Sequence, residues 1–169
     1  MDALYINPFI SSICNTFETM CNVPVTVGKP TLKTSDQPHS DVSSVIGFSG
    51  DAVGSVVLHF SYDIASKLAS RFAGIEITPE HEDFADAVGE LANIVAGGAK
   101  SKFEGLNIGV SLPNVVVGHN HNFSVSKTSP RLVIPCDTEV GQFYVEVAME
   151  LGKQKSAAAP KPSTAGATT

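Results

Sequence analysis

The run of residues 80–103 constrains the fold most, because its apolar side chains recur every three or four positions. At about 100° per residue, this spacing places them in one broad stripe along an α-helix. The stripe consists of Phe84, Ala87, Val88, Leu91, Ile94 and Val95. Such a helix is stable only when another element of the same fold covers its apolar stripe. The rest of the chain must therefore supply a large apolar surface.

Short β-branched segments on both sides of this helix predict that the surface is a sheet. We expect strands over residues 23–27, 31–34, 42–48, 53–60, 108–112, 115–125, 132–136 and 143–151. Gly50 and Asp51 predict a tight hairpin between two of them. An amphipathic helix over residues 6–20, with Pro8 in its opening turn, and a helix capped by Ser61 complete the pattern. This order predicts an α+β fold with helices packed on one face of a largely antiparallel sheet.

A faint internal repeat predicts two related halves. A shift of 86 positions aligns four residue pairs, which are Asn7 with Asn93, Phe17 with Phe103, Glu18 with Glu104 and Met20 with Leu106. Under the same shift, Leu4 in the first half corresponds to Glu90 in the second. Two helix-and-strand halves of this kind predict a pseudo-two-fold arrangement.

Composition places residues 1–152 in one globular domain. Of the 169 residues, 43% are hydrophobic and 17% are charged, and no run of about 18 apolar residues is present to cross a bilayer. From Lys153 onward, no large apolar side chain offsets the entropy lost on ordering. We therefore expect a folded domain over residues 1–152 and a disordered tail, rich in Lys, Ala, Pro and Thr, over residues 153–169.

Charge and cysteine content indicate which partners and which compartment to expect. Three of the 11 basic residues lie in the tail, so residues 1–152 carry 8 Lys and Arg against 17 Asp and Glu. This acidic balance predicts no nucleic-acid partner, and the lack of an apolar span predicts no membrane association. Asp2 and Pro8 do not suit a secretory signal, and three scattered cysteines do not suit a disulfide framework. We expect a cytoplasmic protein with buried thiols at Cys14, Cys21 and Cys136.

The opposite side of the 80–103 helix carries a polar stripe. Its residues are Asp83, Asp86, Glu90, Asn93, Gly97 and Lys100. Asn is a poor helix former, and the glycines at 89, 97 and 98 each cost about 1 kcal/mol relative to alanine in a helix interior. Gly97, one turn beyond Asn93, leaves room for a partner to dock beside that amide. The alternative is an ordinary solvated face, with acids favoured near the helix N-terminus by the macrodipole.

Glu90 and Asn93, one turn apart, suggest chemistry performed on a partner. Neither is a good nucleophile in this setting, and no His, Ser or metal ligand accompanies them, so a self-contained hydrolase is not favoured. An amide can accept from and donate to one water and hold it in line for attack on a phosphoryl group. The carboxylate can pair with a lysine of the partner, which also brings the phosphoryl group and its magnesium.

These residues resemble the signature of the CheC/CheX/FliY family, phosphatases that hydrolyse the aspartyl phosphate of the chemotaxis response regulator CheY. The motif is Asp86-x3-Glu90-x2-Asn93 in the segment DAVGELANIVAGGAK. The opening NPFISSICNTFETM, the following VGKPTLK and a single Glu-x2-Asn motif are similar to the CheX branch. The resemblance covers residues 4–151.

The resemblance implies a role for each residue of the motif. Glu90 and Asn93 are the expected catalytic residues, the first forming a salt bridge to the regulator's lysine and the second orienting the attacking water. Asp86, the first residue of the motif, is an expected partner-binding residue, as is Gly97 from its place on the polar stripe. Pro113, some twenty residues later in the segment SLPNVVVG, also matches the family signature but is given no catalytic role. No cofactor of its own is expected, because Mg²⁺ belongs to the phosphorylated CheY-like receiver domain. The resemblance also implies a homodimer formed through the sheet.

Two other functions stay open from the sequence. A non-catalytic dimeric adaptor of the same fold would dock a signalling partner, although it would have no use for the intact Glu90 and Asn93 pair. A metal-binding module would use His119 and His121, which could lie on one side of a strand but lack a third ligand nearby in the sequence. His59, in an apolar strand, is expected to be a buried or edge histidine.

Overall fold

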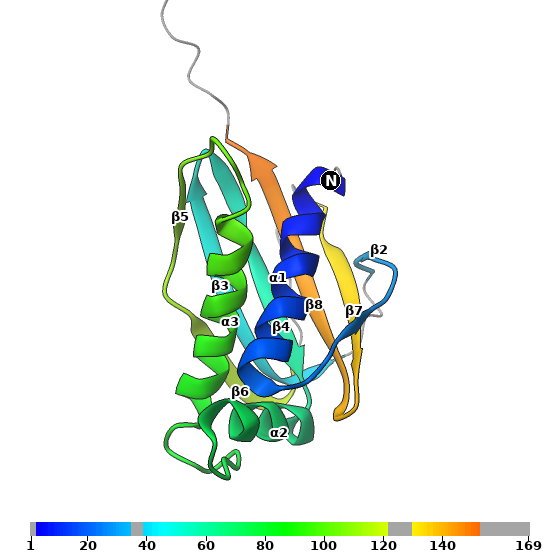
Figure 1. Cartoon of the computed structure of the whole chain (residues 1–169), viewed down its shortest axis with the longest axis vertical. Helices are drawn as coiled ribbons and strands as arrows, with labels where there is room; N and C mark the ends of the chain where they lie inside the picture. Colours follow the sequence, from blue (N-terminus) through cyan, green and yellow to red (C-terminus); the bar gives the residue numbers. More distant parts are fainter. Residues whose placement is uncertain (1–2, 35–38, 122–129, 153–169) are drawn as a thin grey trace, which may run out of the picture.

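A computed structural model describes residues 3–34, 39–121 and 130–152 (Figure 1). The helices are α1 (Ala3–Cys21), α2 (Tyr62–Ala73) and α3 (Phe84–Lys100). The strands are β1 (Thr26–Val27), β2 (Thr31–Leu32), β3 (Ser40–Gly50), β4 (Ala52–Phe60), β5 (Ile108–Val110), β6 (Asn114–His121), β7 (Leu132–Thr138) and β8 (Gly141–Leu151). The predicted tail from Lys153 and the end of the predicted 115–125 strand lie outside these residues.

The strands form one sheet, and its two sides have the same arrangement when β1–β4 of the first half are matched with β5–β8 of the second. The path is β1-β7-β8-β4-β3-β5, with β2 also paired to β7 and β6 also paired to β3. All of these pairings are antiparallel. β4 and β8, which hold equivalent places in the two halves, lie at the centre. The strands next to them, β3 and β7, each pair with two strands from the other half of the sequence. This order confirms the predicted pseudo-two-fold α+β fold.

The helices cover one face of this sheet, with α1 and α3 side by side across it and α2 at one end (Figure 1). Apolar side chains of α3 such as Leu91 and Val95 are fully buried in the same core as Leu58 of β4 and Val145 of β8. Side chains alternate between the two faces along a strand, so every second residue of β4 and β8 lies on the face away from the helices. The stripe that the sequence predicts as core is therefore the packing surface of α3, with only Ile94 partly exposed.

Gly98 allows the close approach of α1 to α3. The Oγ of Ser12 in α1 donates a hydrogen bond to the carbonyl of Val95 at 2.7 Å. A Cβ added at Gly98 would collide with that same Oγ. The free-energy cost of Gly98 in the helix is thus offset by contact with a second helix.

Two local signals are confirmed at the predicted residues. Gly50, with φ +96°, is the last residue of β3, and β3 pairs with β4 from Val42 with Phe60 to Phe48 with Gly54. The Oγ of Ser61 accepts a hydrogen bond from the amide of Ile64 at the start of α2. Turn and cap signals depend only on neighbouring residues, which is why the sequence locates them well.

Some predicted bounds are wrong. The long helix is shorter than residues 80–103, because amide-to-carbonyl bonds three residues apart form separate turns before Phe84 and after Lys100. Pro8 lies inside α1 instead of in its opening turn, because the helix already begins at Ala3. The strands predicted over 23–27 and 31–34 shrink to two residues each.

The cysteines follow the prediction in part. Cys21 and Cys136 are buried, whereas Cys14 is half-buried. Burial raises the pKa of Cys136 to about 12 and that of Cys21 to about 11. Neither thiol is therefore a nucleophile at neutral pH. Across the described residues, no helix is long and apolar enough to span a membrane.

Candidate functional site

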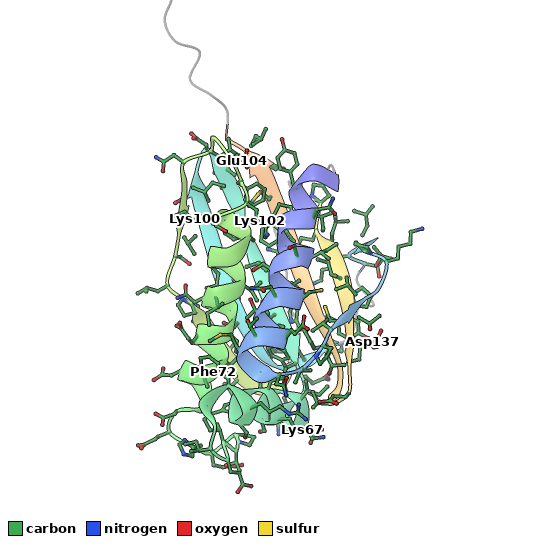
Figure 2. The ribbon with its side chains drawn as sticks, viewed as in Figure 1. Lys67, Phe72, Lys100, Lys102, Glu104 and Asp137 are labelled. Atoms are coloured by element: carbon green, nitrogen blue, oxygen red, sulfur yellow. The ribbon has the colours of Figure 1, made fainter. Side chains whose placement is uncertain are left out.

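The polar stripe of α3 lies on the side of the helix turned away from the core. Asp86, Glu90 and Gly97 are exposed and Asn93 is half-buried. Figure 2 shows Lys100 and Lys102 at one end of α3, and Phe72 of α2 near its other end. The stripe therefore runs from an acidic end beside α2 to a basic end beyond Gly97.

The side chains of the Glu-x2-Asn pair have no partner within the described part of the chain. Neither Glu90 nor Asn93 makes a side-chain hydrogen bond or ion pair there, and Asp86 makes none either. By contrast, Asp63 on α2 binds Lys67 at 2.7 Å. An amide and a carboxylate one turn apart, both without intramolecular partners, are available to a molecule that docks on this face.

The first hollow on this face, which we call the proline hollow, lies between α3 and the start of β6. Its lining is Ala85, Asp86, Gly89, Glu90, Pro113 and Val115. A Cβ built on Gly89 would lie 3.3 Å from Cγ of Pro113 and 3.3 Å from Cγ2 of Val115. Gly89 therefore lets the Pro113 segment lie close to the helix turn that carries Glu90. Leu112, the residue before this proline, is 88% exposed.

The second hollow, which we call the isoleucine hollow, lies on the α2 side of Glu90. Its apolar lining is Phe72, Ala73, Ile75, Ile77 and Ala87, and its carboxylates are Asp83, Asp86 and Glu90. Ile77 is 1% exposed whereas Ile75 is 55% exposed. Asp86 and Glu90 line both hollows and so form the ridge between them.

Gly97 has a different environment from the other two helix glycines. Nothing lies within 4 Å of a Cβ built at this position. No contact inside the described chain therefore explains a glycine there. Gly97 leaves open space one turn beyond Asn93, and the docking of a partner there stays a prediction.

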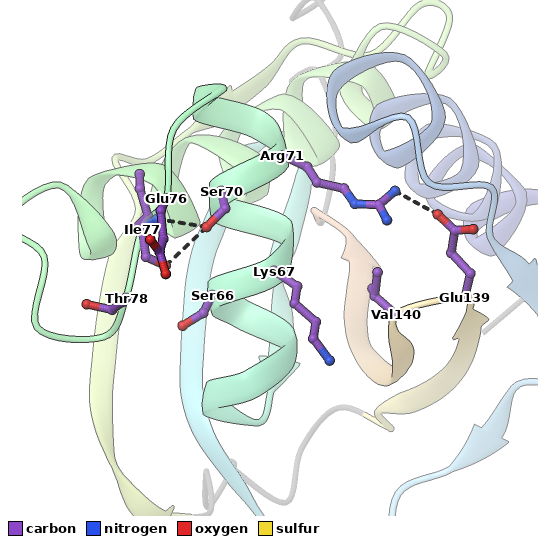
Figure 3. A pocket seen from close by; sticks show the side chains of 9 residues that line it. All are labelled: Ser66, Lys67, Ser70, Arg71, Glu76, Ile77, Thr78, Glu139 and Val140. Atoms are coloured by element: carbon purple, nitrogen blue, oxygen red, sulfur yellow. Dashed lines mark hydrogen bonds and ion pairs between the residues drawn. The ribbon is translucent and has the colours of Figure 1, made fainter.

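A third hollow lies over α2 and is shown in Figure 3. Its cations are already paired, since Arg71 Nη1 lies 2.7 Å from Glu139 Oε1 and Lys67 binds Asp63. The Oγ of Ser70 accepts from the amide of Ile77 at 2.8 Å and donates to its carbonyl at 3.2 Å. These bonds fix the chain that follows α2, and they thereby hold Ile77 in place at the base of the isoleucine hollow.

The two histidines of the metal-binding alternative have different surroundings. His119 is 85% exposed at its side chain and its Nδ1 lies 3.7 Å from Asp41 Oδ1. His121 Nε2 lies 2.8 Å from the Oγ of Ser43. Among the residues that the structure describes, no three His, Cys, Asp or Glu side chains gather to hold a metal ion.

A buried charge cluster, formed by Glu146, Lys33, Arg131 and His59, lies on the sheet face away from the helices. Glu146 Oε1 lies 2.7 Å from Lys33 Nζ and 3.1 Å from His59 Nε2, and Oε2 lies 3.4 Å from Arg131 Nη1. Burial alone would raise the pKa of Glu146, but hydrogen bonds and charge from His59 and Lys33 outweigh it and lower this pKa to about 2. The prediction of a buried His59 is confirmed.

Sequence reasoning missed this cluster and the isoleucine hollow. The cluster joins His59 of β4 and Glu146 of β8 with Arg131, which precedes β7, and with Lys33, which follows β2. Only the register of the sheet brings them together. For the hollow, the one signal was the pair of isoleucines at 75 and 77 just after α2. The closeness of Pro113 to Gly89 depends on how β6 packs against α3, which no local sequence pattern encodes.

Comparison with known proteins agrees with this architecture. A solved CheC-like superfamily protein from Shewanella sp. PV-4 superposes with a TM-score of 0.81 at 32% identity, covering 89% of this chain and 99% of that one. The CheX–CheY–BeF3–Mg²⁺ complex from Borrelia burgdorferi contains a chain that matches with a TM-score of 0.73 at 25% identity, covering 86% of this chain and 97% of that one. The protein is thus of the CheC-like class of α+β proteins.

Sequence comparison is more specific. The profile of the family described as chemotaxis phosphatase CheX matches residues 42–137. The CheY-P phosphatase CheX of Thermotoga maritima is 35% identical over 124 residues, which cover 71% of this chain and 79% of that protein. The chain belongs to the CheX family.

Proposed function

We propose that the protein is a phosphatase that hydrolyses the aspartyl phosphate of a CheY-like receiver domain in chemotaxis signalling. Membership of the CheX family and a relative named CheY-P phosphatase support the class of reaction and of partner. The observation that carries the proposal within this chain is the pair Glu90 and Asn93, one turn apart on α3. Glu90 is exposed, Asn93 is half-buried, and neither side chain has a partner among the residues that the structure describes.

Asn93 is the catalytic residue for the attacking water. Its amide accepts one hydrogen bond from the water and donates another to it, which holds the oxygen in line with the phosphorus. The water oxygen bonds to phosphorus as the bond from phosphorus to the aspartyl oxygen breaks. The products are inorganic phosphate and the receiver's aspartate. This chain supplies no nucleophile and needs no cofactor of its own, since the Mg²⁺ belongs to the receiver.

Glu90 positions the receiver through a salt bridge with a lysine. Its carboxylate stands on the ridge between the two hollows, so a docked partner removes water from around it. An ion pair that loses solvent on docking fixes orientation as well as contributing affinity. Asp86 binds the partner one turn before Glu90, and the open space at Gly97 receives the partner's backbone beyond Asn93.

The experiment follows phosphate release. Receiver domains from the same genome are phosphorylated with a small phosphodonor, and their dephosphorylation rate is measured with and without the protein. We expect at least one receiver to lose phosphate faster in its presence. Binding of a phosphorylated receiver without any acceleration would contradict the proposal and favour the non-catalytic adaptor.

A further inference from the structure

We infer that the isoleucine hollow is the surface that selects the receiver, and that it takes an apolar side chain lying beside a lysine or arginine. This rests on the proposed function, because the hollow shares Asp86 and Glu90 with the proposed site. The occupant is one structural element of the phosphorylated receiver that docks next to the contact made by Glu90.

The apolar lining of the hollow matches an apolar occupant. Ile77 is buried and forms the base, Phe72 is half-buried, and Ile75 leaves 55% of its surface exposed. Ile75 is therefore an exposed large aliphatic residue directly beside the proposed catalytic helix. Covering such a side chain removes apolar area from water and favours binding.

The charges around the hollow define the rest of the occupant. Asp83, Asp86 and Glu90 are exposed, and the sequence contains no Lys or Arg between Arg71 and Lys100. His81 Nδ1 lies 3.9 Å from Asp83 Oδ2 and accepts a hydrogen bond from the amide of Asp83 at 3.1 Å. An uncompensated group of carboxylates beside an apolar hollow attracts a basic partner surface and repels an acidic one.

The other two hollows lack this combination. The cations of the hollow over α2 are paired with Glu139 and Asp63. The proline hollow shares the ridge carboxylates, but its apolar lining is held close by the contact of Pro113 with Gly89. Of these three hollows in the described part of the chain, the isoleucine hollow alone joins an exposed aliphatic side chain to three carboxylates and to the proposed catalytic turn.

Two substitutions at Ile75 test this assignment on the full chain. Ile75→Ala removes the apolar contact, and Ile75→Lys also places a cation where the partner's cation is expected. Leu32→Ala is the matched control, because Leu32 is 61% exposed on β2 and lines neither hollow. Each variant is compared by thermal unfolding and by saturation curves of phosphate release against a phosphorylated receiver that the wild-type protein dephosphorylates.

We expect Ile75→Ala to raise KM about fivefold and Ile75→Lys about 30-fold, with kcat and unfolding unchanged. Leu32→Ala should keep the wild-type KM. A wild-type KM in both Ile75 variants would overturn the assignment. If these variants also lost self-association while KM stayed unchanged, the occupant of the hollow would be a second copy of the chain.

Failure of the proposed function would give a different result from failure of this assignment, since the wild-type protein itself would then accelerate the dephosphorylation of no receiver.

Discussion

Glu90 and Glu146 are both carboxylates on regular elements, yet their surroundings are opposite. Glu146 is 4% exposed and lies within 3.4 Å of nitrogen atoms of Lys33, His59 and Arg131. Glu90 is exposed on α3 and has no side-chain partner in the described structure. A carboxylate saturated by its own chain stabilises the fold, whereas one without partners at a hollow is available to another molecule. We therefore expect Glu146 to contribute to the stability of the fold and Glu90 to contribute to function.

The largest effect on stability is expected at Glu146. Glu146→Gln keeps the shape but leaves Lys33, Arg131 and His59 without their shared carboxylate. Removing one member of a buried ion pair costs about 3 to 5 kcal/mol. We expect the free energy of unfolding, measured with denaturant near neutral pH, to fall by that amount. A loss below about 1 kcal/mol would show that the cluster does not stabilise the fold.

The pH dependence of stability follows from the same residue. The pKa of Glu146 is lowered to about 2 in the folded protein, so its contribution is fully present above the pKa of an unfolded glutamate. It is lost as pH falls through the folded value. We expect a loss on the order of 3 kcal/mol between about pH 5 and about pH 2. Glu146→Gln should lack this part of the acid dependence in unfolding curves, and equal acid dependence in both proteins would contradict the assignment.

Glu90→Gln should have the reverse phenotype. We expect the unfolding free energy to change by less than about 0.5 kcal/mol, because the side chain is exposed and without partners. Affinity for a phosphorylated receiver should weaken by about 2 kcal/mol, or about 30-fold, because the receiver's lysine loses its ion pair. Glu104→Gln is the control, since Glu104 is exposed beyond the end of α3 (Figure 2). Unchanged affinity in Glu90→Gln would make Glu90 part of a solvated helix face.

Salt provides a smaller test of the same contrast. Raising ionic strength from about 0.05 M to about 0.5 M should raise KM for the receiver about threefold, because the docking charges are exposed before contact. The increase should be smaller in Glu90→Gln. Stability from the Glu146 cluster should change little, because buried pairs are screened weakly. Equal salt dependence of KM in the two proteins would remove Glu90 from the interface.

The contrast also explains how much of the molecule the sequence could predict. The stripes of α3, the Gly50 hairpin and the Ser61 cap depend on neighbouring residues, and the sequence predicted all three. The Glu146 cluster and the isoleucine hollow depend on sheet register and on the turns that follow α2, which no local pattern encodes. The predicted ends of the long helix, at residues 80 and 103, were wrong because single turns continue the helical periodicity beyond both ends of α3. The homodimer stays a prediction, which light scattering at micromolar concentration can check.

The central claim is that Asn93 orients the attacking water, and one comparison tests it directly. Asn93→Ala should lower kcat for phosphate release about 100-fold or more, because the water loses its alignment, while KM and the unfolding free energy stay close to wild type. Asn7→Ala is the matched control, because Asn7 is exposed on α1, the helix equivalent to α3 in the other half of the fold. The account predicts wild-type kcat for Asn7→Ala. Wild-type kcat for Asn93→Ala would contradict it.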